Sequence, residues 1–138
     1  MPIIRRGGPG DLAGVAALQR LCPQAAQWPA ADYLAYDLRV AFCGDRLAGF
    51  LCSRSLAAGE SEILNLAVLP ELRRRGIARQ LVENLLATVQ GPVFLEVRAS
   101  NQPAIQFYNT MGFQQLSLRP AYYDNPPEAA IVMKFHSC

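Results

Sequence analysis

A run of three arginines stands before a glycine in "ELRRRGIARQLVENLL", where a segment with helical periodicity begins. The first residues of a helix carry backbone N–H groups without partners, and the helix dipole adds positive charge there. Cations at that end are unfavourable unless an anion accompanies them. Gly76 lets a ligand approach the backbone closely, and arginines add charge-assisted hydrogen bonds to phosphate oxygens. The turn is therefore a candidate phosphate site, and a solvated basic surface is the alternative that charge alone would favour.

Two common nucleotide signatures are absent from the chain. No G-x-x-x-x-G-K-[ST] pattern occurs, and the arginine-rich turn holds one glycine rather than three. A Walker loop and a dinucleotide fingerprint are thereby excluded.

Size and composition predict one globular domain over residues 1–138. Hydrophobic residues make up 51% and charged residues 17% of the 138, which argues against disorder. The net charge of +2 is too balanced for a protein whose main partner is a nucleic acid.

Four cysteines are scattered along the chain, no two of them spaced as C-x-x-C, and there is one histidine. We therefore expect no metal site and a reducing, cytoplasmic location. No apolar run approaches the roughly 20 residues of a membrane span, and no signal peptide is visible, so we expect no membrane partner.

The periodicity predicts alternating helices and strands. Strands are expected over 2–4, 39–43, 47–55, 61–69, 93–97, 113–119 and 129–135. Helices are expected over 12–22, 27–38, 75–89 and 103–111, and residues 120–128 are expected to form a loop. Asp11 is placed to cap the first helix, and "GDR" reads as the turn of a hairpin.

Residues 62 to 97 form a predicted strand-helix-strand unit, which should be a right-handed crossover between parallel strands. Ligands of such units bind beyond the carboxyl ends of the strands. That end lies just after Val68, next to the arginines. The fold class is therefore α/β.

Three stretches resemble one known family: "AVLPELRRRGIA", "FLEVRASNQPAIQFYNTMGF" and "RPAYYDNPPEAAIVM". The first is similar to the acetyl-CoA motif of the GNAT N-acetyltransferase superfamily. The other two resemble its ribosomal-protein-alanine N-acetyltransferases. The similarity covers about residues 60 to 135, and the earlier residues match in element order.

The resemblance implies a GNAT fold, with a mixed central sheet of about six to seven strands, flanking helices and a central β-α-β acetyl-CoA unit. It also implies acetyl-CoA as co-substrate and no metal. A strand backbone would pair with the pantetheine arm, the arginine-rich turn would hold the pyrophosphate, and Asn101 would contact the cofactor unless it is a plain helix cap. The implied cofactor residues are Leu66, Ala67, Val68, Arg73, Arg74, Arg75, Gly76, Ile77, Ala78 and Asn101.

By the same resemblance Glu96 is the general base and Tyr108 the acid that protonates the leaving sulfur. Glu96 interrupts an apolar strand near its carboxyl end. Alternatively, Glu96 is a solvent-facing residue paired with Arg98. Tyr108 is alternatively an aromatic residue of the core. Glu62 is a rival base, and its own alternative is a charge at a strand edge.

Acetyl transfer to an amine requires the neutral amine. An α-amine has a pKa of about 7.7–8 and a lysine side chain about 10.4. A weaker base is therefore enough to deprotonate an N-terminal acceptor. A carboxylate acting directly or through water would suffice. A strand N–H near Val68 is placed to stabilise the oxyanion.

The acceptor implied by the resemblance is the N-terminal segment of a protein, first an alanine-starting ribosomal protein. Trp28, Tyr122 and Tyr123 would line its groove, unless they simply pack. Relatives read Glu-Asp-Ala where this chain has "EAA" at 128–130, which leaves acceptor specificity open. We expect a monomer or a weak dimer. The alternatives are acetylation of a small amine or a lysine, and a non-catalytic acyl-CoA-binding module.

Overall fold

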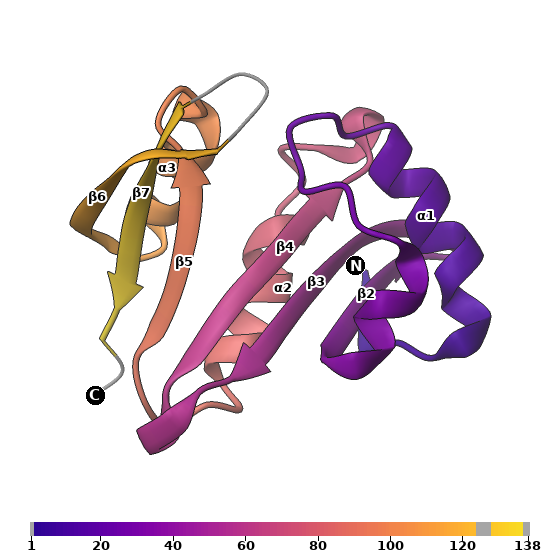
Figure 1. Cartoon of the computed structure of the whole chain (residues 1–138). Coiled ribbons are helices and arrows are strands. Elements are labelled where there is room, and N and C mark those ends of the chain that lie inside the picture. The colour runs from indigo at the N-terminus through magenta and orange to yellow at the C-terminus, as the bar shows by residue number, and fades with distance from the viewer. Residues whose placement is uncertain (1, 124–127, 137–138) are drawn as a thin grey trace. The chain divides into compact units, whose positions relative to one another are not determined.

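The computed structural model describes residues 2–123 and 128–136 (Figure 1). These fall into two compact units, one of residues 1–54 and 64–88 and the other of residues 55–63 and 89–138. The dividing point lies within β4 (Ser61–Val68), so that strand contributes residues to both units. Each unit is described by itself below.

The first unit is a layered arrangement of strands and helices. Its strands follow the order β1 (Ile3–Arg6), β2 (Asp37–Cys43), β3 (Arg46–Ser55) and β4. The pairs β1–β2 and β2–β3 are antiparallel, which confirms the predicted hairpin. The helices are α1 (Leu12–Arg20) and α2 (Ile77–Leu86), and 3-10 turns cover Pro9–Asp11, Ala30–Ala35 and Pro70–Leu72. The core that α1 closes contains Val15, Leu18, Tyr33, Leu38, Val40 and Phe50.

The second unit is a strand group covered by α3 (Gln102–Thr110). The first residues of β4 pair in parallel with β5 (Val93–Arg98), from Ser61–Val93 to Ile63–Leu95. β5 then pairs antiparallel with β7 (Glu128–Phe135), and β7 with β6 (Gln114–Tyr123). A 3-10 turn at Ala57–Gly59 precedes β4. Seven described strands with parallel and antiparallel pairs confirm the predicted mixed α/β class.

Three predicted elements differ from the observed ones. The helix predicted over 27–38 is a 3-10 turn at Ala30–Ala35, which follows Pro29. The helix predicted over 75–89 begins only at Ile77, because Gly76 has a left-handed backbone with φ +82°. The three arginines therefore precede the helix and do not form its first turn.

The strand predicted to end at Arg119 continues to Tyr123, through a residue that sequence reasoning treated as a breaker. Pro120 lies where the β6–β7 register shifts, between the Arg119–Ala130 and Tyr123–Glu128 pairs. A proline lacks an N–H, and strands tolerate it at an edge or a bulge, where that donor is not needed. The predicted loop over 120–128 was therefore wrong at its start, and residues 124–127 lie outside the described part.

Asp11 precedes α1 as predicted but does not cap it. Its carboxylate accepts from the backbone N–H of Gly8 (2.8 Å) and from both terminal nitrogens of Arg5 (2.9 and 2.8 Å). These bonds hold the pKa of Asp11 below its usual value, chiefly through Arg5. The residue fixes the turn between β1 and α1 instead of the helix end.

Close packing of β3 against the end of β4 gives a stability prediction. A Cβ on Gly49 would lie 2.9 Å from the backbone oxygen of Ala67 and 3.2 Å from a methyl of Val68. We expect Gly49→Ala to lower the free energy of unfolding by about 1–3 kcal/mol, because backbone has to move. Urea unfolding measures the change.

The control is Gly8→Ala, at an extended residue where an added Cβ meets no atom within 4 Å. Its expected change is under about 0.5 kcal/mol. Equal stabilities for the two variants would contradict the packing argument.

Candidate functional site

The arginine-rich turn of the first unit lies between β4 and α2. Arg74 has φ +65° and Gly76 φ +82°, so the chain reverses twice before α2 begins at Ile77. A Cβ on Gly76 would meet no atom within 4 Å, so the space beside its backbone is open. Arg74 and Arg75 have no hydrogen-bond or ion-pair partner among the described residues. The turn therefore presents the guanidinium groups of Arg74 and Arg75, which have no partner among the described residues, next to the unobstructed backbone of Gly76.

Arg73 is the arginine of this turn that is already engaged. Its Nε donates to the backbone oxygen of Val68 (3.3 Å), and its Nη2 lies 3.5 Å from the sulfur of Cys22. The Cys22 thiol also donates to the Val68 oxygen (3.4 Å) and is buried. Arg73 and Cys22 thus tie the end of β4 to the turn and to the segment after α1.

The last residues of β4 were predicted to pair with the pantetheine arm. Leu69 donates its N–H to Ala48 of β3 (2.8 Å), and successive N–H groups of a strand point to opposite edges, so the N–H of Val68 points away from β3. That edge already carries two side-chain contacts: the N–H of Leu66 donates to Asn65 (3.0 Å), and the carbonyl of Val68 is bound as above. Strand-like pairing there stays a prediction.

Asn65 connects β4 to the segment that contains Trp28. Its amide exchanges hydrogen bonds with the backbone of Ala26 (2.9 and 3.3 Å) and donates to the Tyr33 hydroxyl (2.7 Å), which donates to Gln19. Trp28 stacks on Tyr33, with ring centroids 5.3 Å apart. The ring of Trp28 therefore has a packing role, and its predicted contact with an acceptor is untested.

The second unit places Glu96 on β5 in a half-buried position. Its Oε1 accepts from Nη1 of Arg119 (3.0 Å), and its side chain is 19% exposed. Its Oε2 is buried and has no hydrogen-bond partner among the described residues. Arg98, the partner weighed for Glu96 from the sequence, pairs instead with Glu128 (3.3 Å). One carboxylate oxygen of Glu96 is thus held by Arg119, and the other is buried without a partner among the described residues.

Tyr108 lies on α3 and is 7% exposed. Its ring packs edge-on against Phe107 and Phe113, at centroid distances of 5.2 and 5.4 Å. Burial raises the pKa of Tyr108 well above its usual value, which favours the protonated phenol near neutral pH. The side chain is thus a core aromatic that carries a phenol proton.

Glu96 and Tyr108 are not hydrogen-bonded to each other in the described residues. Phe113 packs on Phe135, which is opposite Val93 in the register, so Tyr108 belongs to the face of β5 that contains Val93. Burial alternates along β5, and Glu96 therefore lies on the other face. The predicted pair approaches β5 from opposite sides.

Asn101 caps α3, which is one of the two roles that the sequence predicted for it. Its Oδ1 accepts from the backbone N–H of Ala104 (3.3 Å). A cofactor contact of Asn101 is untested. Tyr122 and Tyr123 lie at the end of β6, where each ring is covered by an arginine: Arg119 is 4.9 Å and Arg98 4.3 Å from the ring centroids.

Sequence reasoning missed Arg119, Cys22 and Arg73 as the residues that hold the candidate groups in place. Nothing in the local sequence marks them, because each acts on a residue more than 20 positions away or through a backbone carbonyl. The signal for Arg119 is the strand register, which a single sequence does not give.

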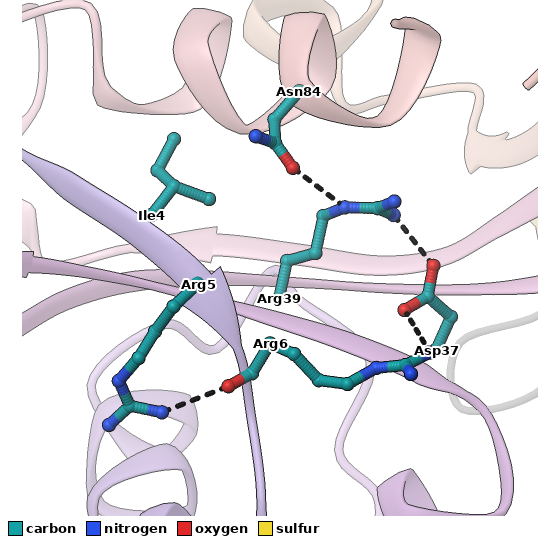
Figure 2. A pocket seen from close by; sticks show the side chains of 6 residues that line it. All are labelled: Ile4, Arg5, Arg6, Asp37, Arg39 and Asn84. Carbon is teal, nitrogen blue, oxygen red and sulfur yellow. Dashed lines mark hydrogen bonds and ion pairs between the residues drawn. The ribbon is translucent and has the colours of Figure 1, made fainter. Parts of the chain in front are cut away.

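A depression of about 310 Å³ lies elsewhere in the first unit, and its side chains are occupied with one another (Figure 2). Arg39 donates to Asn84 of α2 (2.8 Å), Asp37 (2.7 Å) and Thr88 (2.9 Å), and Arg6 donates to the other Asp37 oxygen (3.3 Å). None of the predicted site residues lines it. The cluster fastens α2 to β2.

A family model described as the acetyltransferase (GNAT) family matches residues 13–113. The chain belongs to this family. It is similar to the ribosomal protein bS18-alanine N-acetyltransferase of Salmonella typhimurium, with 37% identity over 95 residues, and the match spans 64% of this chain and 64% of that relative's length. The resemblance inferred from the sequence is confirmed.

Two solved structures are similar over nearly the whole chain. The ribosomal-protein-S18-alanine N-acetyltransferase from Escherichia coli is 27% identical with a TM-score of 0.84, and the match covers 99% of this chain and 94% of that one. Naa20 from Chaetomium thermophilum, solved with a bisubstrate analogue, is 27% identical with a TM-score of 0.86, covering 97% and 86%. The GNAT fold predicted from the sequence is confirmed.

The sequence predicted no metal site and no membrane partner. The described residues contain no group of three or more His, Cys, Asp or Glu side chains that could hold a metal ion. None of the helices in the described part of the chain is long and apolar enough to cross a membrane.

The different states of the three arginines predict different effects of their removal. Arg74→Ala and Arg75→Ala should each weaken binding of CoA about tenfold, the worth of one charge-assisted hydrogen bond, and leave the melting temperature unchanged. Arg73→Ala should lower the melting temperature, because it releases the Val68 carbonyl. Calorimetric titration with CoA and thermal unfolding measure both.

Arg79→Ala is the matched control, since Arg79 lies one turn later and makes only a 3.8 Å pair with Glu83. It should change neither quantity. Normal CoA affinity in both the Arg74 and Arg75 variants would favour the alternative interpretation, in which the turn is only a solvated basic surface.

Proposed function

We propose that the protein transfers the acetyl group of acetyl-CoA to the N-terminal α-amine of a protein. An alanine-starting ribosomal protein, met in the cytoplasm, is the first candidate acceptor. The main support is the 37% identity to a relative named for that reaction. Because the match covers less than two thirds of that relative, activity and acceptor are both proposals for this chain.

The first unit would bind the co-substrate. Its arginine-rich turn fits a pyrophosphate, because the backbone beside Gly76 is open and Arg74 and Arg75 have no partner among the described residues. A helix N-terminus adds unpaired N–H groups and favourable charge. No metal is needed in this proposal.

The second unit would move the protons. Acetyl-CoA supplies a thioester whose C–S bond breaks as the C–N bond to the amine forms. The Glu96 carboxylate takes the proton that the amine nitrogen loses. Tyr108 donates its proton to the departing sulfur and regains one from solvent.

Two other functions remain as alternatives. Transfer to a lysine or a small amine uses the same groups on a more basic acceptor. A non-catalytic acyl-CoA-binding module would use the turn but would have no use for the unpaired oxygen of Glu96. A buried, unpaired carboxylate oxygen is costly, and that cost favours an enzyme.

Turnover of an alanine-starting ribosomal-protein peptide tests the proposal. Glu96→Gln should lower kcat by about 10²–10⁴-fold, because it removes the base, and Tyr108→Phe should lower kcat through loss of the acid. Mass spectrometry of the peptide measures the acetyl group, and calorimetry with CoA shows that binding is retained.

Two control peptides distinguish the alternatives. A peptide with a blocked N-terminus and an internal lysine should stay unmodified, as should a polyamine. Acetylation of either with an inert alanine peptide would favour the lysine or small-amine function. Tight CoA binding without turnover of any amine would favour the binding module, and full activity of Glu96→Gln would move the base to Glu62 or to water.

A further inference from the structure

The two oxygens of the Glu96 carboxylate have different surroundings. Oε1 accepts from Nη1 of Arg119 at 3.0 Å, whereas Oε2 is buried with no partner among the described residues. A carboxylate can accept about four hydrogen bonds. The Glu96 carboxylate therefore makes fewer hydrogen bonds to the described residues than it could accept.

Arg119 reaches Glu96 across the strand that separates them. β7 lies between β5 and β6, and its residue opposite Arg119 is Ala130, whose side chain is small. Glu96 is opposite Val132, two residues further along β7. The long side chain of Arg119 passes diagonally over β7 to the carboxylate, and its guanidinium also lies 4.9 Å from the ring centroid of Tyr122.

The other cation close to Glu96 on its own strand is engaged elsewhere. Arg98 pairs with Glu128 (3.3 Å) and covers the ring of Tyr123, while Glu128 accepts from the backbone N–H of Ser100 (2.6 Å). These bonds lower the pKa of Glu128, chiefly through Ser100. The charged and titratable groups on this face of the second unit's strands are Glu62, Arg98, Arg119, Tyr122, Tyr123, Glu128 and Lys134.

We propose that Arg119 is a positioning residue, which fixes the orientation of the Glu96 carboxylate through Oε1. The inference rests on the proposed function, because it assigns the base role to Glu96. In the step it serves, the N–H bond of the amine breaks and its proton goes to the Glu96 carboxylate, while Arg119 keeps its own protons. The product acid returns that proton to solvent.

Arg119→Met tests this role. We expect kcat to fall about tenfold while the KM for acetyl-CoA and the melting temperature stay unchanged, since the Arg119 side chain is 53% exposed. Arg119→Lys should recover part of kcat.

Arg79→Met is the matched control, because the side chain of Arg79 is also 53% exposed and pairs with a glutamate. It should leave both kcat and the KM for acetyl-CoA as in the native protein. Arg119→Met added to Glu96→Gln should cause no further loss, because Arg119 acts through Glu96.

The outcomes separate the two proposals. Full activity of Glu96→Gln alone would overturn the base assignment and the inference with it. An inactive Glu96→Gln together with a native kcat for Arg119→Met would overturn only the positioning role. A further loss in the double variant would also overturn it, since Arg119 would then act independently of Glu96.

Discussion

The central constraint of the second unit is a buried oxygen, Oε2 of Glu96, that has no hydrogen-bond partner among the described residues. Leaving such a group unpaired costs about 1–3 kcal/mol, and more when it is charged. The alternation of β5 places Glu96 opposite the face that packs on α3, and Arg119 holds its other oxygen. The described part of the unit therefore keeps a carboxylate in a half-buried place without satisfying both of its oxygens, an arrangement that is compatible with the proposed base role.

In the first unit, the arginines after β4 also differ in their contacts. Arg73 and Cys22 both bind the Val68 carbonyl, so the strand end is fixed before any ligand is present. Arg74 and Arg75 lie beyond that anchor in a backbone that turns through the left-handed region. The conflict between arginines and a helix dipole is thus smaller than the sequence suggested, because one arginine has an internal partner and all three precede the helix. A bound anion would remove what remains of it.

Local patterns in the sequence were enough to predict most of the fold. Turn residues predicted the hairpin, and the strand-helix-strand order predicted the parallel pairing of β4 with β5, because both depend on local patterns. The start of α2 and the continuation of β6 through Pro120 were mispredicted, because a left-handed glycine and an edge bulge override local propensity. Neither the Glu96–Arg119 pair nor the Cys22–Val68 contact was predictable, since they join residues 23 and 46 positions apart through the tertiary fold.

The chemistry of the proposed base bears on which amine would be acetylated under the proposed function. A lysine amine is more basic than an α-amine by about 2.5 pKa units, so making it neutral costs about 3.5 kcal/mol more at the same pH. A single carboxylate with one oxygen committed to Arg119 offers no second charge to meet that cost. Tyr108 cannot contribute as a base either, because burial raises its pKa and keeps it protonated. The groups assembled in the second unit therefore match an acceptor that is already partly neutral near pH 7, which is the property of a protein N-terminus.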